Sequence, residues 1–429
     1  MPGKLAGAGA SPTKRKSRVR FSGPVPTLVR KKANLQLIDN IPVWGSPVDE
    51  GALRQIKTCA RQADHVALMA DHHLGYAVPI GGVVAYADAI SPSGVGYDIA
   101  CGNKAVLTDA TAREVRPDIV RIMDDIWKTI SFGVGRENTD ERVDHPLFDD
   151  PAWSLPAAAQ LKEMARQQLG TVGSGNHYVD IFSDEEDRVW IGVHFGSRGL
   201  GHKTATFFLK TAGAIEGMEV DPCVIPARSE LGIDYLECMR LAGLYAYAGR
   251  DWVCSRVARI LGAAVVEEVH NHHNFAWRET HEGRDLWVVR KGATPAFDGQ
   301  KGFVGGTMGE NSVILEGVES ELGKHSLYST VHGAGRRLSR MEAKGKVNKQ
   351  GVVTREPKVT QEMMDTWVSG AHVELRGAGV DESPHCYKRL PEVLAEHAGS
   401  IRILHTLTPI GVAMAGKNEF DPYKDWVFR

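Results

Sequence analysis

Five glycine-flanked segments of this chain carry side chains that bind metals or act as nucleophiles. They lie at residues 94–102 (GVGYDIACG), 173–177 (GSGNH), 194–202 (HFGSRGLGH), 270–274 (HNHHN) and 332–336 (HGAGR). Glycine adopts backbone conformations closed to other residues and lets the main chain approach a ligand closely. One such segment would carry little weight, but five indicate a single polar site assembled from most of the chain.

The first four segments supply a possible set of metal ligands. Asp98 and Cys101 stand three residues apart in a glycine-rich turn, a spacing that can place a carboxylate and a thiolate on one cation. His177, His194 and His273 would complete the shell, because neutral imidazole is the commonest metal ligand. Thiolate and imidazole favour zinc or iron, whereas carboxylate favours manganese or magnesium, so the metal stays open. Each histidine taken alone is more often structural, and only their recurrence favours a metal site.

Amide, guanidinium and ammonium groups near these residues suit phosphate. Asn176 and Asn274 each adjoin a proposed ligand, so their amides either donate to a phosphate oxygen or only form turns. Residues 196–199 (GSRG) and Arg336 offer backbone and guanidinium donors, and residues 291–294 (KGAT) add a cation. The sequence has no match to the P-loop pattern G-x-x-x-x-G-K-[ST], so a P-loop nucleotide fold is not supported.

His332 differs from the other histidines because two glycines and Arg336 follow it closely. A neutral imidazole there can attack a phosphorus atom and form a phosphoramidate, while Arg336 and a metal neutralise charge. Local sequence alone fits a structural histidine equally well.

Elements from the whole chain must position these groups. The sequence predicts helices at 46–62, 111–130, 155–169 and 234–262, strands at 188–194, 285–291 and 311–317, and short strands with tight loops over 75–102. Ser46 is the expected N-cap of the first helix, with Pro47 at its first position, and Gly170 the expected C-cap of the third. Motifs run from residue 71 to 416 without a clear linker, which favours one large α+β domain.

The composition, 42% hydrophobic and 24% charged, is that of a globular protein. We expect no membrane span, because no run of about 18 apolar residues occurs. The six cysteines show no paired short spacing and the N-terminal stretch has no apolar signal region, so a reducing, cytoplasmic location is expected.

Residues 1–38 hold nine Lys/Arg and no Asp/Glu, so a formal net charge of −2 less this +9 leaves −11 for the rest. We expect residues 1–34 to form a basic, disordered tail and residues 35–429 to form the catalytic domain. The tail either holds a polyanion such as RNA through its phosphates or is a solvated segment without a specific role.

Over about residues 35–416 the chain resembles the RtcB family of RNA-splicing ligases. The matching segments, in the family's order, are 71–76 (DHHLGY), 79–82 (PIGG), 93–98 (SGVGYD), 101–102 (CG), 173–177 (GSGNH), 196–202 (GSRGLGH), 273–274 (HN), 290–294 (RKGAT), 308–309 (MG) and 332–336 (HGAGR). The resemblance implies a single compact α+β domain of RtcB type, with mixed β-sheets flanked by helices.

The resemblance also implies an activity. RtcB-like enzymes use GTP and manganese to join RNA ending in a 3′-phosphate or 2′,3′-cyclic phosphate to RNA with a 5′-hydroxyl, in tRNA splicing or RNA repair. The residue matching His332 would take GMP from GTP and pass it to the RNA 3′-phosphate, and the 5′-hydroxyl would displace it. The sequence does not reveal the physiological RNA, the oligomeric state or any need for an archease-like activator.

Site roles follow from the same resemblance. Cys101 would bridge two Mn²⁺ ions, one completed by His194 and His273 and the other by Asp98 and His177. Catalysis would fall to His332 and Arg336. The residues assigned to GTP and its phosphates are Asn176, Tyr178, Asp180, Asn274, Thr307, Ser312, Gly333, Ala334 and Gly335.

The chain departs from the family pattern near the guanine. A lysine usually contacts guanine close to the end of the family, but residues 409–416 (PIGVAMAG) place Met414 there, with Lys417 three residues on. Asp180 stands where glutamate is common, and Glu310-Asn311 replaces small residues beside the nucleotide. These changes bear on nucleotide choice more than on the metals.

Three functions are therefore compared. The first is the RNA ligase, and the second is an RtcB-like metal-dependent phosphodiesterase or nucleotidyltransferase with altered nucleotide choice. The third is a non-catalytic protein that binds RNA ends. The presence of His332 and all five metal-capable residues argues against the third, whereas Met414 keeps the second open.

Overall fold

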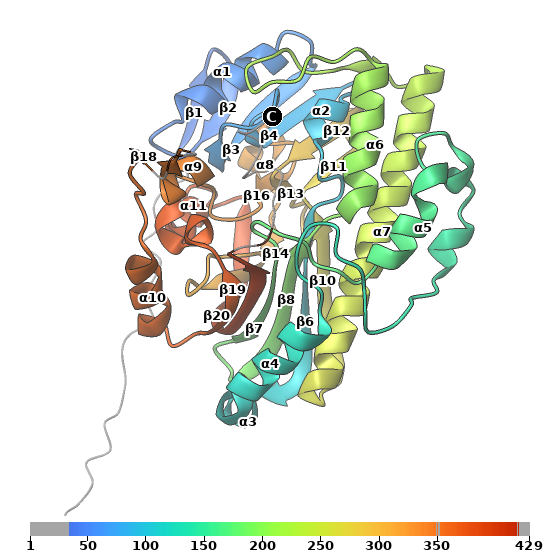
Figure 1. Cartoon of the computed structure of the whole chain (residues 1–429). Coiled ribbons are helices and arrows are strands. Elements are labelled where there is room, and N and C mark those ends of the chain that lie inside the picture. The colour runs from blue at the N-terminus through green and yellow to red at the C-terminus, as the bar shows by residue number, and fades with distance from the viewer. Residues whose placement is uncertain (1–33, 349, 351, 418, 420–429) are drawn as a thin grey trace, which may run out of the picture. The chain divides into compact units, whose positions relative to one another are not determined.

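Two mixed β-sheets form the framework of the protein, as the computed structural model in Figure 1 shows. The structure describes residues 34–417 except 349 and 351, together with residue 419. The basic stretch 1–34, predicted to be a disordered tail, lies outside these residues except for its last position. The α+β class predicted from the sequence is confirmed, because helices pack on sheets that contain antiparallel and parallel pairs.

Each sheet joins strands from distant parts of the chain. From one edge to the other, the first sheet runs β1 (Leu35–Ile38), β2 (Ile41–Trp44), β3 (His65–His73), β4 (Ile80–Tyr86), β12 (Arg284–Lys291), β11 (Asn274–His281). The second runs β10 (Val265–His272), β6 (Gly102–Thr111), β8 (Arg188–Phe195), β7 (Tyr178–Ser183), β20 (Ile401–Gly416), β15 (Ser312–Gly317), β14 (Lys301–Val304), with β19 (Glu374–Ala378) beside β20. Three short pairs join β13 (Ala293–Pro295) to β16 (Ser329–Val331), β5 (Ala89–Ile90) to β9 (Ile225–Pro226), and β17 (Lys346–Val347) to β18 (Val353–Arg355).

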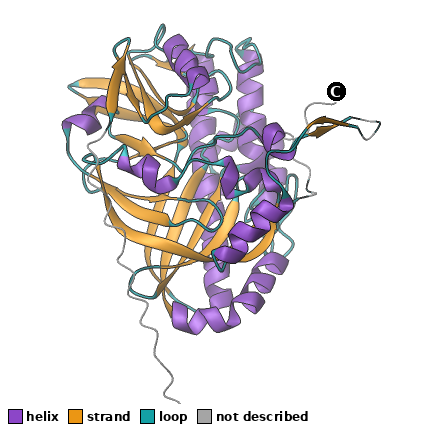
Figure 2. Ribbon diagram, turned by 90° about the vertical axis from the view of Figure 1, so that its left-hand side faces the viewer, coloured by secondary structure: helices purple, strands orange, loops and turns teal. Residues whose placement is uncertain are grey.

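The helices lie around these sheets (Figure 2). They are α1 (Glu50–Cys59), α2 (Pro92–Val95), α3 (Ala112–Val115), α4 (Ile119–Thr129), α5 (Lys162–Gln168), α6 (Arg198–Thr211), α7 (Glu230–Leu261), α8 (Glu321–His325), α9 (Arg340–Lys344), α10 (Gln361–Gly370) and α11 (Leu390–Ala395). Among the described residues, no helix combines the length and the apolarity that crossing a membrane requires.

Helix α7 is long enough to join the cores of both sheets. Tyr235 and Met239 in its first half pack in the core cluster that includes β3 and β4, and Val253 and Val257 in its second half pack in the cluster under β8. Ser229 caps its first turn by accepting a hydrogen bond from the Gly232 amide. The helix predicted at 234–262 is thus confirmed, with a start four residues earlier because Ser229 is the N-cap.

Strands predicted at 188–194, 285–291 and 311–317 are confirmed as β8, β12 and β15. The region 75–102 forms strands and loops as predicted, with the short helix α2 in addition. The helix predicted at 111–130 is interrupted by a 3₁₀ turn at Arg116–Asp118, because Pro117 lacks the N–H that a continuous α-helix needs.

Two predicted helix starts are wrong. Asp49, not Ser46, caps α1, because its carboxylate accepts the Ala52 amide at 2.7 Å, and the helix runs only from Glu50 to Cys59. The helix predicted at 155–169 begins at Lys162, after a 3₁₀ turn. Gly170, the predicted C-cap, has a left-handed backbone with φ of 84° just beyond the cap residue.

Side-chain alternation along the second sheet decides which groups reach the site. On β8, Val189, Ile191 and Val193 face α4 and α7, so Trp190 and His194 face the other side. The same alternation on β7 and β20 brings further side chains to that face, and these are Tyr178, Asp180, Val412 and Met414. The sheet face opposite α4 and α7 therefore carries residues from strands far apart in the sequence.

Candidate active site

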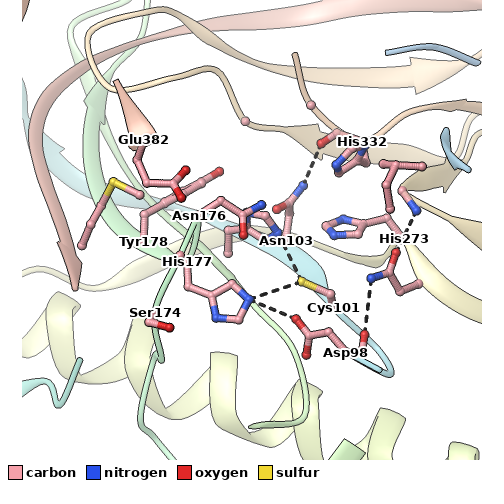
Figure 3. A pocket seen from close by; sticks show the side chains of 18 of the residues that line it. Asp98, Cys101, Asn103, Ser174, Asn176, His177, Tyr178, His273, His332 and Glu382 are labelled. Carbon is pink, nitrogen blue, oxygen red and sulfur yellow. Dashed lines mark hydrogen bonds and ion pairs between the residues drawn. The ribbon is translucent and has the colours of Figure 1, made fainter. Parts of the chain in front are cut away.

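A cavity of about 510 Å³ opens over this face of the second sheet. It is lined by all the residues that the sequence assigned to metal, nucleotide or catalysis, except Ser312. Figure 3 shows several of them, from loops and strand ends of different parts of the chain, pointing toward one another. The structure thus brings one dispersed set of residues into one site.

Backbone hydrogen bonds shape the loop that carries Asp98 and Cys101. The Cys101 amide donates to the Asp98 carbonyl at 3.0 Å, which closes a tight turn. The Ala100 amide donates to the Asn274 carbonyl at 2.7 Å, and the His273 amide donates to the Cys101 carbonyl at 2.8 Å. The connection between β10 and β11 is therefore hydrogen-bonded to this loop, and these bonds place His273 beside Cys101.

The five proposed metal ligands form two groups that share Cys101. One group is Cys101, His194 and His273, the other is Asp98, Cys101 and His177, and within each group the ligand atoms lie within 4.8 Å of one another. The Cys101 Sγ atom lies 3.3 Å from His194 Nε2 and 3.7 Å from His177 Nε2. A shared sulfur between two groups is an arrangement suited to a pair of cations.

Two features indicate that the imidazoles of His177 and His273 can act as metal ligands. His177 Nδ1 donates to the Val172 carbonyl at 2.9 Å. This leaves Nε2 directed at Asp98 and Cys101 (Figure 3). His273 Nδ1 is buried without a hydrogen-bond partner among the described residues. An unsatisfied nitrogen in a buried polar cluster is unfavourable unless a ligand or ion takes its lone pair.

The electrostatics also fit divalent cations. Burial, together with the nearby Asp98 carboxylate, raises the pKa of the Cys101 thiol well above its ordinary value. A bound cation would supply the charge that stabilises the thiolate. Burial lowers the pKa of His194 and His273 well below the ordinary value, so both imidazoles are neutral and able to coordinate.

His332 is held by a buried carboxylate. Its Nδ1 lies 2.6 Å from Asp71 Oδ2, and its backbone amide donates to the same oxygen at 3.0 Å. Although burial alone would raise it, contact with His332 lowers the pKa of the Asp71 carboxyl. The charged carboxylate therefore accepts a hydrogen bond from the Nδ1–H group, which leaves the Nε2 lone pair for reaction. The His332 ring centroid lies 4.9 Å from that of His273, beside the metal group.

Sequence reasoning gave Asp71 no role, although it lies in the matching segment 71–76. Lys388 was not singled out at all, yet its Nζ donates to the Ala70 and His72 carbonyls at 2.9 Å each and brackets Asp71. Asp71, near the end of β3, meets His332, which lies 261 positions further along the chain. This contact follows from the fold, and no local sequence pattern predicts it.

Arg336 lines the cavity but is extensively bonded to the protein. Its guanidinium donates to the Leu338 and Asp381 carbonyls, to Glu382 at 3.3 Å and to the Tyr387 hydroxyl at 2.8 Å. These bonds use four of its five N–H donors. Arg336 therefore contributes a fixed positive charge at the cavity wall more than a free fork for phosphate.

Asn274 is bonded on both sides of its amide. Its Oδ1 accepts the Gly292 amide at 2.7 Å, and its Nδ2 donates to the Asp98 carbonyl at 3.4 Å. Of the two roles considered for this residue, the structure shows the turn-holding contacts, while Asn176 lies on the cavity wall (Figure 3). Ser312 accepts the Gly306 amide at 2.9 Å and supports the cavity from behind.

The far side of the cavity combines apolar side chains with two buried polar atoms. Met414 pairs with Tyr178, and Val412 with Asp180, in the antiparallel register of β20 and β7. The Tyr178 hydroxyl and Asp180 Oδ1 have no hydrogen-bond partner among the described residues. Burial raises the pKa of both groups well above their ordinary values.

Gly305 keeps this side open. A Cβ atom there would lie 2.1 Å from the Tyr178 hydroxyl oxygen, so only glycine lets that hydroxyl take its place at the cavity wall. Thr307 on the same loop donates to Glu310 at 2.9 Å. Met414 lines the cavity, whereas Lys417 is exposed at the surface.

Comparison with known proteins agrees with these features. A family model described as tRNA-splicing ligase RtcB matches residues 52–415. The RNA-splicing ligase RtcB of Escherichia coli (strain K12) is 32% identical over 414 residues, which cover 87% of this chain and 97% of that relative. The tRNA-splicing ligase RtcB of Archaeoglobus fulgidus is 29% identical and covers 81% of this chain and 86% of its own length. The RNA-splicing ligase RtcB homolog 1 of Entamoeba histolytica is 28% identical, with 82% and 83% covered.

Proposed function

Because the chain belongs to the RtcB family of tRNA-splicing ligases and is thus an RNA ligase, we propose that it works through a histidine–GMP intermediate. In this proposal it joins RNA 3′-phosphate or 2′,3′-cyclic phosphate ends to 5′-hydroxyl ends, with GTP as co-substrate and Mn²⁺ as the metal. The observation that carries the proposal is His332, paired with Asp71 and adjacent to a cluster of five metal-capable side chains.

The first step uses the lone pair that Asp71 leaves on His332 Nε2. This nitrogen attacks the α-phosphorus of GTP, a P–N bond forms, and the P–O bond to pyrophosphate breaks. The imidazole gains positive charge in this step, and the Asp71 carboxylate 2.6 Å from Nδ1 stabilises that charge. Asp71 thereby has the orienting and compensating role that a carboxylate has beside a catalytic histidine.

The later steps return His332 to its neutral form. A 2′,3′-cyclic phosphate is first opened by water, which breaks the P–O2′ bond and gives a 3′-phosphate. An oxygen of the RNA 3′-phosphate attacks the phosphorus of the His332 adduct, the P–N bond breaks, and GMP passes to the RNA end. The RNA 5′-hydroxyl oxygen then attacks the activated 3′-phosphorus, loses its proton and displaces GMP. Arg336 and the main chain at 333–335 lie at the cavity wall where the phosphates would bind.

Asp98, Cys101, His177, His194 and His273 would hold two divalent cations, with Cys101 shared. When bound, the two cations would act as Lewis acids that polarise phosphoryl oxygens and offset negative charge. The unsatisfied His273 nitrogen, the shared sulfur and the mixed carboxylate, thiolate and imidazole donors support this assignment.

The guanosine part of GTP would lie against the apolar far side of the cavity. Tyr178, Asp180 and Thr307 line that side, and its two unsatisfied polar atoms would find partners in a bound nucleoside. Asn176 would contact a phosphate. RNA with the stated ends is the proposed substrate and the cytoplasm the proposed location, while an archease-like activator stays a prediction.

The proposal is tested by incubating the protein with radiolabelled GTP and Mn²⁺. We expect covalent label that is lost in acid and stable in alkali, as a phosphoramidate is. His332→Ala should lose the label and keep its bound metal, whereas His325→Ala, at an exposed histidine, should keep both. Persistent labelling of His332→Ala would show that another residue is the nucleophile. A labelled wild type that fails to join RNA ends would favour the nucleotidyltransferase alternative, which Met414 keeps open.

A further inference from the structure

Arg250, on α7, is buried completely beneath the proposed metal ligands. Its hydrogen-bond acceptors among the described residues are two backbone carbonyls and two imidazoles, and none of them is a carboxylate. Burial of a charged group without an opposite charge bonded to it is costly. This cost indicates that the guanidinium is needed at this position for the geometry of its hydrogen bonds.

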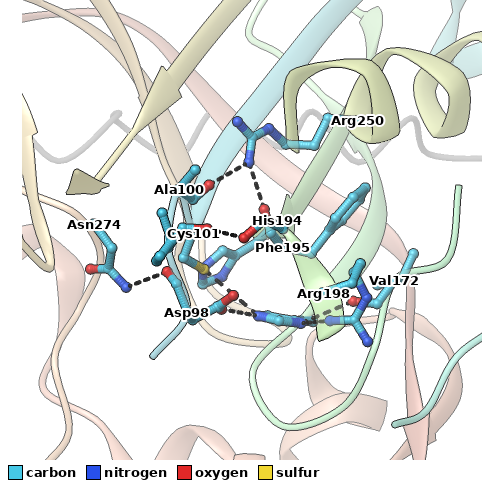
Figure 4. Close-up of polar contacts among 12 residues, drawn as sticks. Asp98, Ala100, Cys101, Val172, His194, Phe195, Arg198, Arg250 and Asn274 are labelled. Atoms are coloured by element: carbon cyan, nitrogen blue, oxygen red, sulfur yellow. Dashed lines mark hydrogen bonds and ion pairs between the residues drawn. The ribbon is translucent and has the colours of Figure 1, made fainter. Parts of the chain in front are cut away.

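The guanidinium reaches three strands of the second sheet. Nη1 donates to the Ala100 carbonyl at 3.1 Å and to the Phe195 carbonyl at 2.6 Å (Figure 4). Nη2 donates to His272 Nδ1 at 2.9 Å, and Nε donates to His270 Nε2 at 2.7 Å. These acceptors lie on or just before β6, at the end of β8 and on β10, which are neighbours in the sheet.

Three of the four acceptor residues adjoin a proposed metal ligand in the chain. The pairs are Ala100 with Cys101, Phe195 with His194, and His272 with His273. Those three ligands form one complete group of the metal cluster. We infer that Arg250 is a positioning residue whose planar fork sets the spacing of Cys101, His194 and His273. This inference deepens the proposed function and rests on it.

The planar fork of the guanidinium distinguishes this positioning role from two simpler ones, which are to supply positive charge and to fill buried volume. Lysine would keep a positive charge, but its donors all radiate from one nitrogen and do not reach acceptors on three strands. Methionine would keep most of the buried apolar volume without any donor. If charge alone mattered, Arg250→Lys would function, and if packing alone mattered, Arg250→Met would function. We expect both variants to lose the metal geometry.

The test is metal binding by the full chain, without RNA or GTP. Mn²⁺ affinity is measured by calorimetric titration, and Co²⁺ is added separately because its absorption reports thiolate coordination. Both Arg250 variants should bind Mn²⁺ about 10- to 100-fold more weakly, the usual effect of losing a partner that orients metal ligands. Their Co²⁺–thiolate band should shift or weaken.

Arg290→Lys is the matched control. Arg290 is also completely buried, but its guanidinium bonds Glu279, Ser329 and the Leu327 carbonyl, none of which adjoins a proposed ligand. This control should lose stability and keep the Mn²⁺ affinity of the folded protein. Comparison with it separates the loss of a buried arginine from the loss of this particular fork.

The inference would be overturned if either Arg250 variant kept the Mn²⁺ affinity and the Co²⁺ spectrum of the wild type. That result would leave the proposed function intact. If neither variant folds, His270→Leu decides, because it removes the acceptor of Arg250 Nε and His270 does not itself adjoin a proposed ligand in the chain. Weaker Mn²⁺ binding by that variant supports the inference, and unchanged binding overturns it. A wild type that binds neither metal overturns the proposed metal role and this inference with it.

Discussion

The two sides of the cavity are built in different ways. On the metal side, protein groups fix the side chains: Val172 orients His177, and Gly292 and the Asp98 carbonyl hold Asn274. On the opposite side, Tyr178 and Asp180 have unsatisfied atoms. Apart from His273 Nδ1, which is also unsatisfied, the metal side is therefore held by protein groups before any ligand binds, whereas the other side depends on a ligand to satisfy its buried polar atoms.

The departures from the RtcB pattern follow the same division. The five metal ligands that the resemblance to the family implies lie together in the structure. Met414, Asp180 and Glu310, which differ, lie on the side where the nucleoside would bind or next to it. We therefore expect substitutions on the metal side to remove the reaction, and those on the other side to change which nucleotide is used.

The largest effect is expected for Cys101→Ala. One sulfur belongs to both ligand groups, so its loss should remove both cations at once. We expect Mn²⁺ content measured by elemental analysis to fall to background, and ligation to fall by at least about 10³-fold, as for removal of an essential catalytic group. Cys254→Ala, at a buried cysteine of α7 outside the cavity, is the control and should retain metal. Normal Mn²⁺ content in Cys101→Ala would refute a shared thiolate ligand.

Asp71→Asn should have the next largest effect. An amide can donate to His332 Nδ1, which would favour the tautomer with its proton on Nε2 and block the nucleophile. We expect the rate of covalent GMP labelling to fall roughly 10²- to 10⁴-fold, where the upper value is the loss seen when a catalytic histidine is held in the wrong tautomer. Mn²⁺ content should stay normal, which separates this variant from Cys101→Ala.

The control for that prediction is Asp64→Asn, an acid just before β3 that bonds Arg284 and the Ala87 amide at the surface. It should label at the wild-type rate. A normal labelling rate in Asp71→Asn would mean that the carboxylate does not set the tautomer of His332.

Asp71 also marks the limit of what the sequence could predict. Glycine-flanked motifs identified His332 and the metal-capable residues, because local turns bring such side chains out of regular structure. Partners that act through tertiary contact gave no local signal, and Asp71, Arg250 and Lys388 are such residues. Each bonds a segment more than 140 residues away, which only the sheet order of the fold determines.

The fold shows the same pattern. Strands with a continuous buried apolar run, such as β8, and the long helix α7 were predicted well. Helix starts near Asp49 and Lys162 were not, because nearby Ser, Pro and Ala residues offered equally plausible local starts. β20 was missed because its first half is partly exposed and its second half buried, so no single period runs through its 16 residues.

The smallest predicted effect concerns the side of the cavity that departs from the family. Met414 is 5% exposed and lines the cavity beside Tyr178, its partner in the register of β20 and β7. The exposed Lys417 lies beyond the end of β20. A lysine at position 414 could donate to the guanine carbonyl, and adenine offers no acceptor there. Methionine packs against a base as a flexible apolar surface and cannot donate.

We therefore expect weak discrimination between GTP and ATP in the wild type, with Asp180 accepting from the N1 and amino groups of guanine. Labelling by GTP is measured against rising ATP. Met414→Lys should raise the preference for GTP by roughly tenfold, the value of one added hydrogen bond to a charged donor. Lys417→Met is the matched control and should change nothing, since Lys417 is exposed. Strong exclusion of ATP by the wild type, lost in Lys417→Met and unaffected by Met414→Lys, would show that Lys417 reaches the base and supplies the contact to guanine.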